Sequence, residues 1–277
     1  MNTDYLILGN GYLGNNFATY FEGICSKKTF YTEQDVTNEI AFTRPRYVIN
    51  CAGKTGRPNI DWCEHNKEET FFANVVLPTF IQKACAKFNA KMIHIGSGCT
   101  YQGDNGGKGY SETDAPNWDG NYYAWTKIVS ERYLSDFDVL QIRIRMPFHY
   151  DNNPRNLLTK LLKYEKVVEA ENSITYVPDL LKAVNALIQK NATGIYNVVN
   201  KESITHGRIL HHYEKISGKK LDYELIKASD LDSMTLVRRS NCVLSVDKLD
   251  ACGIYMPSAI DAMERAVFYA CNPSEVA

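Results

Sequence analysis

The sequence predicts an α/β protein built on a doubly wound parallel sheet. Short apolar runs at residues 5–8, 46–50, 91–95 and 139–144 are typical of buried strands, and the stretches between them carry apolar residues at helical spacing. The first run leads directly into a glycine-rich turn. Strands that alternate with helices form a parallel sheet with helices on both faces. With 277 residues, the chain is long enough for one large unit or two closely joined ones.

The glycine-rich turn has the spacing of a dinucleotide-binding fingerprint. Gly9, Gly11 and Gly14 follow the first strand as GxGxxG, and residues 15–21 have a helical pattern. Glycines at this spacing permit a tight turn and let a pyrophosphate approach the N-terminus of a helix. We therefore expect a Rossmann-like fold. The residues expected to contact the cofactor are Gly9, Gly11, Tyr12, Leu13, Gly14, Asp35, Asn50, Ala52, Gly53, Tyr123, Lys127 and Met146.

The residues after the fingerprint leave the choice between NAD and NADP open. Residues 29–32 are predicted to be the second strand, and Glu33 lies about twenty residues past the fingerprint, where an acid usually holds the ribose of NAD. Asp35 is an alternative acid for the region near the adenine. Lys27 and Lys28, just before the predicted strand, argue in the opposite direction.

The middle of the chain continues the alternation of strands and helices. Residues 68–88 are predicted to form one long packed helix, in which Asn74 is a polar residue able to bond backbone near the strand ends. Residues 103–109 are rich in glycine and are expected to form a mobile surface loop. Residues 122–134 have a helical pattern and precede the fifth strand.

Beyond Pro147 the elements become shorter, and a small cap that is interleaved with the first domain is expected. We predict helices at residues 157–164, 177–190 and 259–269, and a strand at residues 194–199 that returns to the main sheet. The expected domains are a dinucleotide-binding domain of residues 1–147, with a helix and a strand near 173–204, and a substrate-binding cap of residues 148–172 and 205–277.

Three residues form a pattern suited to the reduction of a carbonyl. Tyr123 and Lys127 are four residues apart, so both side chains lie on one side of a helix. A phenol can donate a proton to a nascent alkoxide, and an ammonium beside it lowers its pKa from about 10. Ser97, at the end of the fourth strand, could polarise the carbonyl.

Composition excludes several other classes of protein. A net charge of −1 gives no electrostatic reason to bind nucleic acid or an anionic membrane. The N-terminus reads as a strand and not as a signal peptide, and no apolar run is long enough to span a membrane. The eight cysteines lack the spacing of a zinc site, so we expect no metal and reduced thiols in the cytoplasm.

Several longer motifs carry a resemblance to a known family. They are GRPNIDWCE at residues 56–64, RIRMP at 143–147, NPRN at 153–156, YEKVV at 164–168 and RSN at 239–241. Together with the fingerprint, Ser97, Tyr123 and Lys127, this set resembles the extended short-chain dehydrogenase/reductase family. Within that family it looks like the bifunctional 3,5-epimerase/4-reductases of UDP-L-rhamnose synthesis known from plants, which are similar to dTDP-4-dehydrorhamnose reductases.

The resemblance implies NADPH as cofactor, with NADH as the alternative, and UDP-4-keto-6-deoxyglucose as substrate. By position, Cys99 resembles the epimerising cysteine of the family and Lys160 its partner. Lowering a thiol pKa from ~8.5 to near 7 requires about 2 kcal/mol, whereas lowering a lysine pKa from ~10.4 to 7 requires about 4.6 kcal/mol. A Cys99 thiolate base and a Lys160 ammonium acid are therefore the less costly pair. Tyr123 would then donate the proton that completes reduction at C4.

The expected substrate site contains these groups and several residues of the longer motifs. Arg155 and Arg239 are candidates for the diphosphate because a guanidinium binds phosphate oxygens in a bidentate manner. The residues expected to contact the substrate are Arg57, Asn59, Ser97, Cys99, Arg155, Asn156, Arg239 and Asn241.

Three alternatives remain open at this point. The first is a GDP-4-keto-6-deoxymannose epimerase/reductase of the fucose pathway, and the second is a plain 4-keto-rhamnose reductase without epimerase activity. The third is a non-catalytic NADP-binding regulatory subunit, against which the intact Ser97, Tyr123 and Lys127 argue. A small-molecule substrate is the expected partner, and the oligomeric state stays open, with a homodimer as one option.

Overall fold

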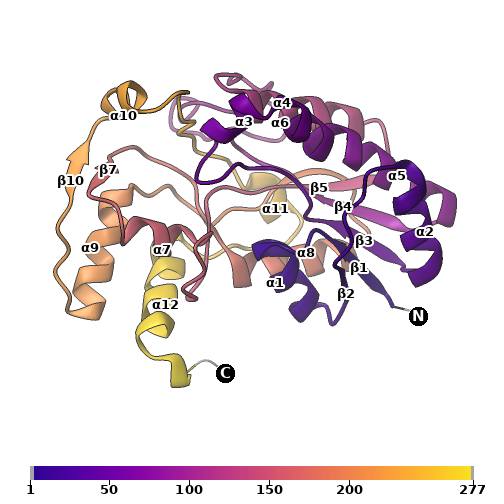
Figure 1. The fold of residues 1–277 in the computed structure, drawn as a ribbon. Coiled ribbons are helices and arrows are strands. Elements are labelled where there is room, and N and C mark those ends of the chain that lie inside the picture. Colours follow the sequence, from indigo (N-terminus) through magenta and orange to yellow (C-terminus); the bar gives the residue numbers. More distant parts are fainter. Residues whose placement is uncertain (1–2, 276–277) are drawn as a thin grey trace. The chain divides into compact units, whose positions relative to one another are not determined.

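Strands and helices alternate along the chain as predicted (Figure 1). The computed structural model describes residues 3–275. The elements are β1 (Tyr5–Leu8), α1 (Tyr12–Tyr20), β2 (Ile24–Ser26), α2 (Glu33–Thr43), β3 (Tyr47–Asn50), α3 (Asp61–His65), α4 (Lys67–Phe71), a π-helix (Phe72–Val76), α5 (Leu77–Phe88), β4 (Lys91–Ile95), α6 (Tyr122–Leu134), β5 (Val139–Arg143), β6 (Pro147–Phe148), α7 (Leu157–Leu161), β7 (Lys166–Val168), β8 (Thr175–Tyr176), α8 (Val177–Gln189), β9 (Gly194–Asn197), α9 (His206–Ser217), β10 (Glu224–Ile226), α10 (Ala228–Met234), α11 (Asp247–Ala251), α12 (Ala259–Cys271) and a 3₁₀ turn (Pro273–Glu275).

Within the described residues, six strands form one sheet in the order β2-β1-β3-β4-β5-β9. The pairs β1–β2, β1–β3, β3–β4 and β4–β5 are parallel. The chain leaves β1 toward β2 and then returns to β3 on the other side, so the strand order reverses between β1 and β3. Ligands of open parallel sheets bind at the carboxyl ends of the strands at such a reversal. The predicted fold class, including the return of residues 194–197 to the sheet, is confirmed.

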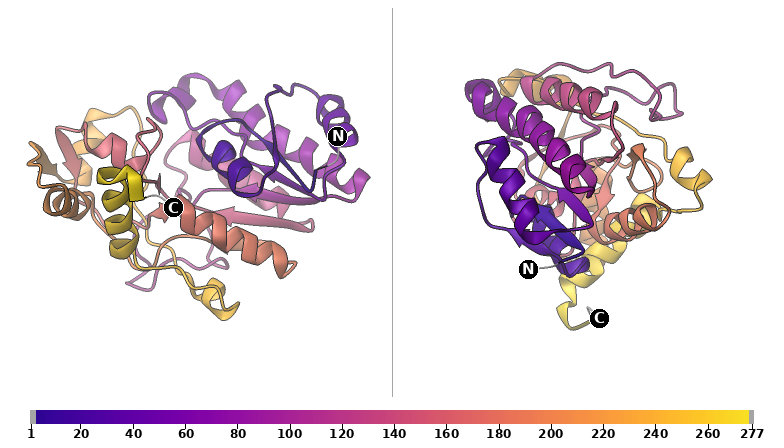
Figure 2. Two further views of the ribbon diagram at one scale, coloured as in Figure 1. Left: turned by 90° about the horizontal axis from the view of Figure 1, so that it is seen from below. Right: turned by 90° about the vertical axis from the view of Figure 1, so that its right-hand side faces the viewer.

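Buried apolar residues hold a layer of helices against the sheet. The side chains of β1 at Leu6, Ile7 and Leu8 are fully buried, as expected for a strand covered on both faces. Leu6 and Leu8 pack in one cluster with residues of α2, α5 and α6, which include Val36 and Ile81. The helices of this layer lie together in Figure 1 and in the two further views of Figure 2.

The second strand lies earlier in the chain than the sequence predicted. β2 is Ile24–Ser26, which pairs with β1, and residues 29–32 form a loop. Thr32 begins a capping box: its side chain accepts the backbone N–H of Asp35, and the Asp35 carboxylate accepts the N–H of Thr32. Phe30 is buried against Val36 and its neighbours. The β-forming residues of this stretch therefore anchor the entry into α2.

The long helix predicted at residues 68–88 is interrupted. A π-helix at Phe72–Val76 separates α4 from α5. Pro78 lies in the first turn of α5 and has no N–H to donate to the carbonyl of Asn74 four residues earlier. Single π-turns inside α-helices occur frequently at functional sites. The interruption places Asn74 at the centre of the wider turn.

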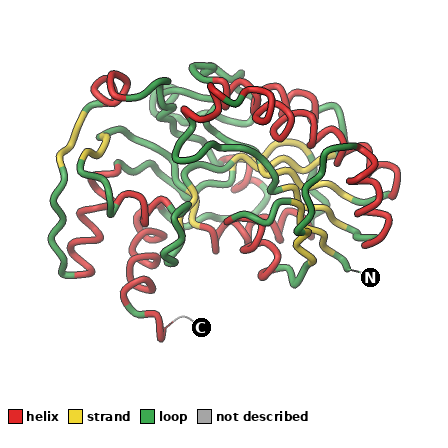
Figure 3. Tube along the Cα trace, viewed as in Figure 1, coloured by secondary structure: helices red, strands yellow, loops and turns green. Residues whose placement is uncertain are grey.

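The chain passes several times between two compact units. The first contains the residues up to Thr100, Trp118–Arg143 and Ile188–Tyr196, and the second contains Tyr101–Asn117, Ile144–Leu187 and the residues from Asn197 onward. The first unit holds the main sheet. In the second unit, α9 and α12 lie side by side, and the strands form two short pairs, β6–β8 and β7–β10 (Figures 1 and 3).

The glycine-rich loop expected to be mobile is anchored at both ends in the second unit. The N–H of Gly103 donates to the carbonyl of Asn241, and the Gly103 carbonyl accepts the N–H of Val243. Tyr110 forms a similar bridge with Leu244. The tip of the loop, at Gly106 and Gly107, is exposed. These bridges explain why residues 101–117 group with the second unit, although they follow directly on the end of β4 in the chain.

Candidate active site

The glycines of the fingerprint have distinct structural requirements. Gly9 has a φ of +102°, and a Cβ there would lie 2.5 Å from the backbone nitrogen of Ala52; at Gly14 it would lie 1.8 Å from the Gly9 carbonyl oxygen. At Gly11, by contrast, no atom lies within 4 Å of a Cβ. No side chain caps α1, which begins at Tyr12. The first turn of α1, with Tyr12 and Leu13, thus has room for a pyrophosphate at its N-terminus.

Asn50 shapes the backbone that follows β3. Its Oδ1 accepts the N–H of Ala52 at 3.0 Å, which orients the amide so that Nδ2 donates to Nδ1 of His94 at 3.0 Å. His94 therefore carries its proton on Nε2 and is neutral. Burial lowers the pKa of His94 to about 3, with the charge on Lys127 as a smaller cause. His94 is thus a buried histidine of β4, and the buried Asn50 orients the Ala52 backbone through its side chain.

The charged residues considered for cofactor choice lie between the end of β2 and the first turn of α2. Asp35 accepts the N–H groups of Tyr31 and Thr32, and these hydrogen bonds lower its pKa. Its observed role is thus to cap α2, and its contact with the cofactor stays a prediction. Because β2 ends at Ser26, Lys27 and Lys28 follow the strand directly. Lys28 pairs with the buried Glu39 at 2.5 Å, whereas Lys27 is exposed.

Ser97 and Cys99 follow β4 at the carboxyl edge of the sheet. The buried Oγ of Ser97 accepts the backbone N–H of Cys99 at 3.1 Å. Since this bond uses Oγ as an acceptor, the hydroxyl proton is suited to donation to a substrate oxygen. The Cys99 thiol is partly accessible, while Ser97 and Thr100 are buried.

Tyr123 and Lys127 lie on α6 with their side chains close together. The Lys127 Nζ is 6.0 Å from the centre of the Tyr123 ring, and both residues are buried. Burial lowers the pKa of Lys127 to about 8, and the thiols of Cys99, Cys51 and Cys63 partly oppose this shift. A Cβ at Gly53 would lie 3.6 Å from Nζ, so the lysine extends from α6 toward the end of β3.

Asn74 ties α6 to the loop after β3. Its Oδ1 accepts the N–H of Lys54 at 2.8 Å, and its Nδ2 donates to the Lys54 carbonyl and to Oγ1 of Thr126. Thr126 in turn donates to the carbonyl of Tyr123 at 2.8 Å. The sequence singled out Asn74 as a backbone-binding residue, but it gave no role to Thr126. Its position three residues after Tyr123 on the same helix is the signal that could have identified it.

Lys160 lies on α7 in the second unit. Burial and the neighbouring positive charge of Arg155 lower its pKa, in that order. Asn156, by contrast, is buried and caps α7: its Oδ1 accepts the N–H groups of His149 and Leu158. Its Nδ2 donates to the carbonyl of His149 at 2.8 Å. Both the oxygen and the nitrogen of the Asn156 side chain are therefore used in hydrogen bonds within the unit, and the contact of Asn156 with the substrate stays a prediction.

Three other residues predicted to contact substrate or cofactor lie in the second unit and make contacts within it. Arg239 is half-buried and donates to the carbonyl of Val237 at 3.0 Å. Asn241 accepts a hydrogen bond from Asn172 at 3.0 Å, so its side-chain oxygen is used inside the unit. Met146 has a positive φ of 41°, and its sulfur lies 3.4 Å from Nε2 of His206.

Arg57 and Asn59 lie in a tight turn before α3 in the first unit. A Cβ at Gly56 would lie 2.1 Å from the Asn59 carbonyl oxygen, which explains the glycine at the start of the turn. The Asn59 side chain accepts the N–H of Asp61 at 2.8 Å. The Arg57 side chain is exposed. Arg57 thus presents an exposed guanidinium group, whereas the Asn59 side chain is used to stabilise the turn.

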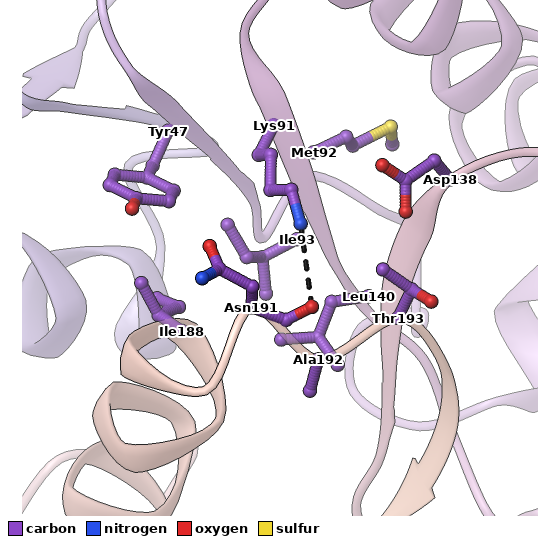
Figure 4. A pocket seen from close by; sticks show the side chains of 10 residues that line it. All are labelled: Tyr47, Lys91, Met92, Ile93, Asp138, Leu140, Ile188, Asn191, Ala192 and Thr193. Atoms are coloured by element: carbon purple, nitrogen blue, oxygen red, sulfur yellow. Dashed lines mark hydrogen bonds between the residues drawn. The ribbon is translucent and has the colours of Figure 1, made fainter.

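A small hollow in the first unit lies away from the residues described above. It lies among the first residues of β3, β4 and β5 and the turn after α8, with a volume of about 10 Å³, close to that of one water (Figure 4). Lys91 donates across it to the Asn191 carbonyl at 3.5 Å. Because it adjoins the amino ends of these strands, it is remote from Ser97 and Cys99.

Among residues 3–275, no group of three or more His, Cys, Asp or Glu is arranged to hold a metal, and no helix there has the length and apolar character of a membrane span.

Comparison with known proteins identifies the family. Residues 23–259 match the RmlD substrate binding domain. The chain belongs to this family. It is 33% identical over 249 residues to the bifunctional dTDP-4-dehydrorhamnose 3,5-epimerase/dTDP-4-dehydrorhamnose reductase of Arabidopsis thaliana, which covers 87% of this chain and 82% of that protein. A trifunctional UDP-glucose 4,6-dehydratase/UDP-4-keto-6-deoxy-D-glucose 3,5-epimerase/UDP-4-keto-L-rhamnose-reductase of the same plant is 33% identical over 244 residues, which cover 86% of this chain and 36% of that protein.

Solved structures give the same result for the fold. The L780 UDP-rhamnose synthase from Acanthamoeba polyphaga mimivirus superposes with a TM-score of 0.90 at 27% identity, covering 97% of this chain and 99% of that one. A dTDP-4-dehydrorhamnose reductase from Bacillus anthracis, in complex with NADP, has a TM-score of 0.83 at 21% identity and covers 96% and 97%. The resemblance to the extended short-chain dehydrogenase/reductases is confirmed, and the protein is an enzyme of this type.

Proposed function

We propose that this enzyme inverts C3 and C5 of UDP-4-keto-6-deoxy-D-glucose and then reduces the C4 ketone with NADPH, giving UDP-L-rhamnose. The observation that carries the proposal is the placement of Cys99 beside Ser97. With a hydride from the cofactor, Ser97, Tyr123 and Lys127 account for the reduction of a ketone. The partly accessible thiol adds a base that reduction does not need. The Arabidopsis relative is named as an enzyme with both activities.

Epimerisation begins with proton removal next to the C4 ketone. The Cys99 thiolate takes the proton from carbon and becomes a thiol, and the electron pair moves into an enolate on the C4 oxygen. The Ser97 hydroxyl stabilises this oxygen. A Lys160 ammonium returns a proton to the opposite face of the carbon. Its lowered pKa makes it a stronger acid, which supports this role. Exchange with water then returns Cys99 to the thiolate and Lys160 to the ammonium, and the same two proton transfers at the second carbon complete the inversion.

Reduction then uses α6. When bound, NADPH would supply the hydride to C4. Tyr123 donates its phenolic proton to the C4 oxygen, and the Lys127 ammonium aids reprotonation of the phenolate. With a pKa of about 8, Lys127 is mostly protonated at pH 7 and yet close to the pH at which it exchanges protons. Its buried position keeps the ammonium near the Tyr123 ring.

The residues of the first unit fit NADPH. The open N-terminus of α1 and the open position at Gly11 suit the pyrophosphate. The corrected position of β2 puts Lys27 directly after the strand, where it would attract a 2′-phosphate. Lys28 is less suited to this role because it pairs with Glu39. Arg57 in this unit, and Arg155 and Arg239 in the second, are proposed to bind the diphosphate of the sugar nucleotide.

The test is an incubation of the enzyme with UDP-4-keto-6-deoxyglucose in D₂O, with NADPH or NADH. The expected product is UDP-L-rhamnose that carries deuterium at C3 and C5, formed with preference for NADPH. A 6-deoxy sugar without inversion or deuterium would identify a plain reductase instead. The same incubation with the dTDP- and GDP-linked ketones tests the nucleotide, since relatives are named for both UDP and dTDP sugars.

A further inference from the structure

The motif at residues 56–64 ends in Glu64, a residue for which the proposed function gives no role. Glu64 lies on α3, and its Oε1 accepts the backbone N–H of Tyr122 at 2.6 Å. Tyr122 is the first residue of α6, and the next residue is Tyr123. The two partners are 58 residues apart in the chain. This hydrogen bond therefore connects the turn and α3 to the start of the helix that carries the phenol.

The first turn of α6 is held at several points. The N–H groups at the start of a helix have no partner within the helix, and acceptors there stabilise it. Asn121 accepts the N–H of Ala124 at 2.8 Å, which is an ordinary local cap. Glu64 supplies the acceptor for Tyr122 from another element. A carboxylate also interacts favourably with the positive end of the helix dipole.

Backbone groups on both sides of the Tyr123 side chain thus make hydrogen bonds to other residues. The N–H of the preceding residue, Tyr122, donates to Glu64, and the carbonyl of Tyr123 itself accepts the hydroxyl of Thr126 at 2.8 Å. Thr126 is itself bound by Asn74 at 3.1 Å. Loss of Glu64 would remove the acceptor of the Tyr122 N–H and loosen the start of the helix, while the Asn121 cap and the Thr126 contact remained. Tyr123 lies in that first turn, and Lys127 lies one turn further along.

We propose that Glu64 is a positioning residue for reduction, which holds the Tyr123 phenol in place through the backbone N–H of Tyr122; this rests on the proposed role of Tyr123 as proton donor. Glu64 contacts neither substrate nor cofactor in this assignment. A consequence separates it from a purely structural residue. Reduction depends on Glu64, whereas proton exchange by Cys99, which follows β4 and is not on α6, does not.

The experiment compares Glu64→Ala with Glu64→Gln, and uses Glu68→Ala as the matched control. Glu68 is an exposed glutamate on the neighbouring α4, so its removal makes the same change in charge. A displacement of about 1 Å can cost about 100-fold in rate. We expect Glu64→Ala to lower kcat for reduction about 10- to 100-fold with little change in KM. Glu64→Gln keeps an acceptor oxygen and is expected to stay within about threefold of the parent enzyme.

Deuterium exchange into C3 and C5 without cofactor is the second readout. It is expected to continue at the parent rate in Glu64→Ala. An equal fall of exchange and reduction would show a general loss of structure and would overturn the positioning role. Reduction by Glu64→Ala at the rate of Glu68→Ala would also overturn it. If the parent enzyme itself does not reduce the ketone, or if Tyr123→Phe reduces it fully, the proposed function fails instead.

A second pair of variants tests the same hydrogen bond from the donor side. Tyr122→Ala keeps the backbone N–H, and Tyr122→Pro removes it. Proline is favoured at the first position of a helix, and the extended Asn121 (φ −157°, ψ 160°) is compatible with a following proline. The rate of ketone reduction is expected to be lower in Tyr122→Pro than in Tyr122→Ala, by about the factor expected for Glu64→Ala relative to the parent enzyme. Equal reduction rates in this pair would contradict the positioning role, even if Glu64→Ala does not fold.

Discussion

The two compact units use their polar residues for different purposes. In the first unit, the proposed chemical groups are oriented by internal hydrogen bonds: Ser97 is bound by the N–H of Cys99, and the backbone around Tyr123 is fixed by Thr126. In the second unit, the side chains of Asn156 and Asn241 make hydrogen bonds within the fold, and the arginines beside them in the motifs are the proposed ligands of the diphosphate. Asn156, which caps α7, and Arg155 illustrate this division.

The difference leads to a rule that can be tested. Residues of the first unit are expected to control rates, and charged residues of the second unit are expected to control substrate affinity. Two residues are exceptions: Lys160 of the second unit has a lowered pKa that suits a proton donor, and Arg57 of the first unit is proposed to bind the diphosphate. Variants in the two units should therefore change kcat and KM separately.

The largest effect is expected for Tyr123→Phe, which removes the proposed proton donor of the first unit. General acid catalysis contributes about 10²- to 10⁴-fold, so reduction should slow by about that factor. Deuterium exchange at C3 and C5 should continue. Parallel assays of NADPH oxidation and of exchange measure the two activities. An unchanged rate of reduction would remove Tyr123 from the mechanism.

Arg143→Ala tests how the first unit holds α6. Arg143 on β5 forms a buried, bidentate ion pair with Glu131 on α6, at 2.6 and 2.7 Å. Removal of one partner leaves a buried charge, so the free energy of unfolding should fall by about 3–5 kcal/mol. Urea unfolding measures it. Lys83→Ala, which removes the exposed pair with Glu33, is the control and should cost less than about 1 kcal/mol. Equal losses would contradict the importance of the buried pair.

Two neighbouring residues test the second unit. Arg155→Ala should raise KM for the sugar nucleotide about 10- to 100-fold with little change in kcat, because a hydrogen bond to a charged group contributes about 1.5–3 kcal/mol. Asn156→Ala removes the cap of α7 and should instead lower the free energy of unfolding by about 1 kcal/mol. Steady-state kinetics and thermal unfolding of both variants give the comparison. A normal KM in Arg155→Ala would mean that this arginine does not bind the diphosphate.

The pKa of Lys127 gives a smaller effect that depends on pH. Burial lowers this pKa from its ordinary value of 10.5 to about 8. The ammonium therefore predominates at pH 7 and is lost as the pH rises, so reduction should decline by about tenfold per pH unit well above pH 8. Because the folded state holds this proton less tightly than the unfolded state, the contribution of Lys127 to stability rises between pH 8 and 10.5. A pH–rate profile that stays flat to pH 10 would contradict the role of the ammonium.

The sequence predicted the parts of the site that are local in the chain. The fingerprint with Gly9, Gly11 and Gly14 and the pair Tyr123 and Lys127 each lie within one turn or helix, so their spacing reveals their geometry. The fold class followed from the alternation of elements. The second strand was misplaced because the β-forming residues around Phe30 anchor a loop in the core, which local propensity does not distinguish from a strand.

Contacts between distant residues could not be predicted in this way. The hydrogen bond of Asn50 to His94 spans 44 residues, and that of Asn74 to Thr126 spans 52. Neither pair has a spacing that indicates contact. The motif that contains Arg143 and Arg145 was identified from resemblance, but its ion pair with Glu131 and its contacts with Asn172 and the carbonyl of Ser240 depend on tertiary structure. The sequence thus indicates which residues matter more readily than what they bind.

The central claim is that Cys99 acts in epimerisation and Tyr123 in reduction. It is tested most directly with Cys99→Ala and two substrates. One is UDP-4-keto-6-deoxyglucose, and the other is the corresponding ketone whose C3 and C5 centres are already inverted. We predict that the variant reduces the inverted ketone at nearly the parent rate, yet forms no UDP-L-rhamnose and incorporates no deuterium with the first substrate. Formation of deuterated UDP-L-rhamnose from the first substrate at the parent rate, or equally slow turnover of both, would contradict a separate epimerising role for Cys99.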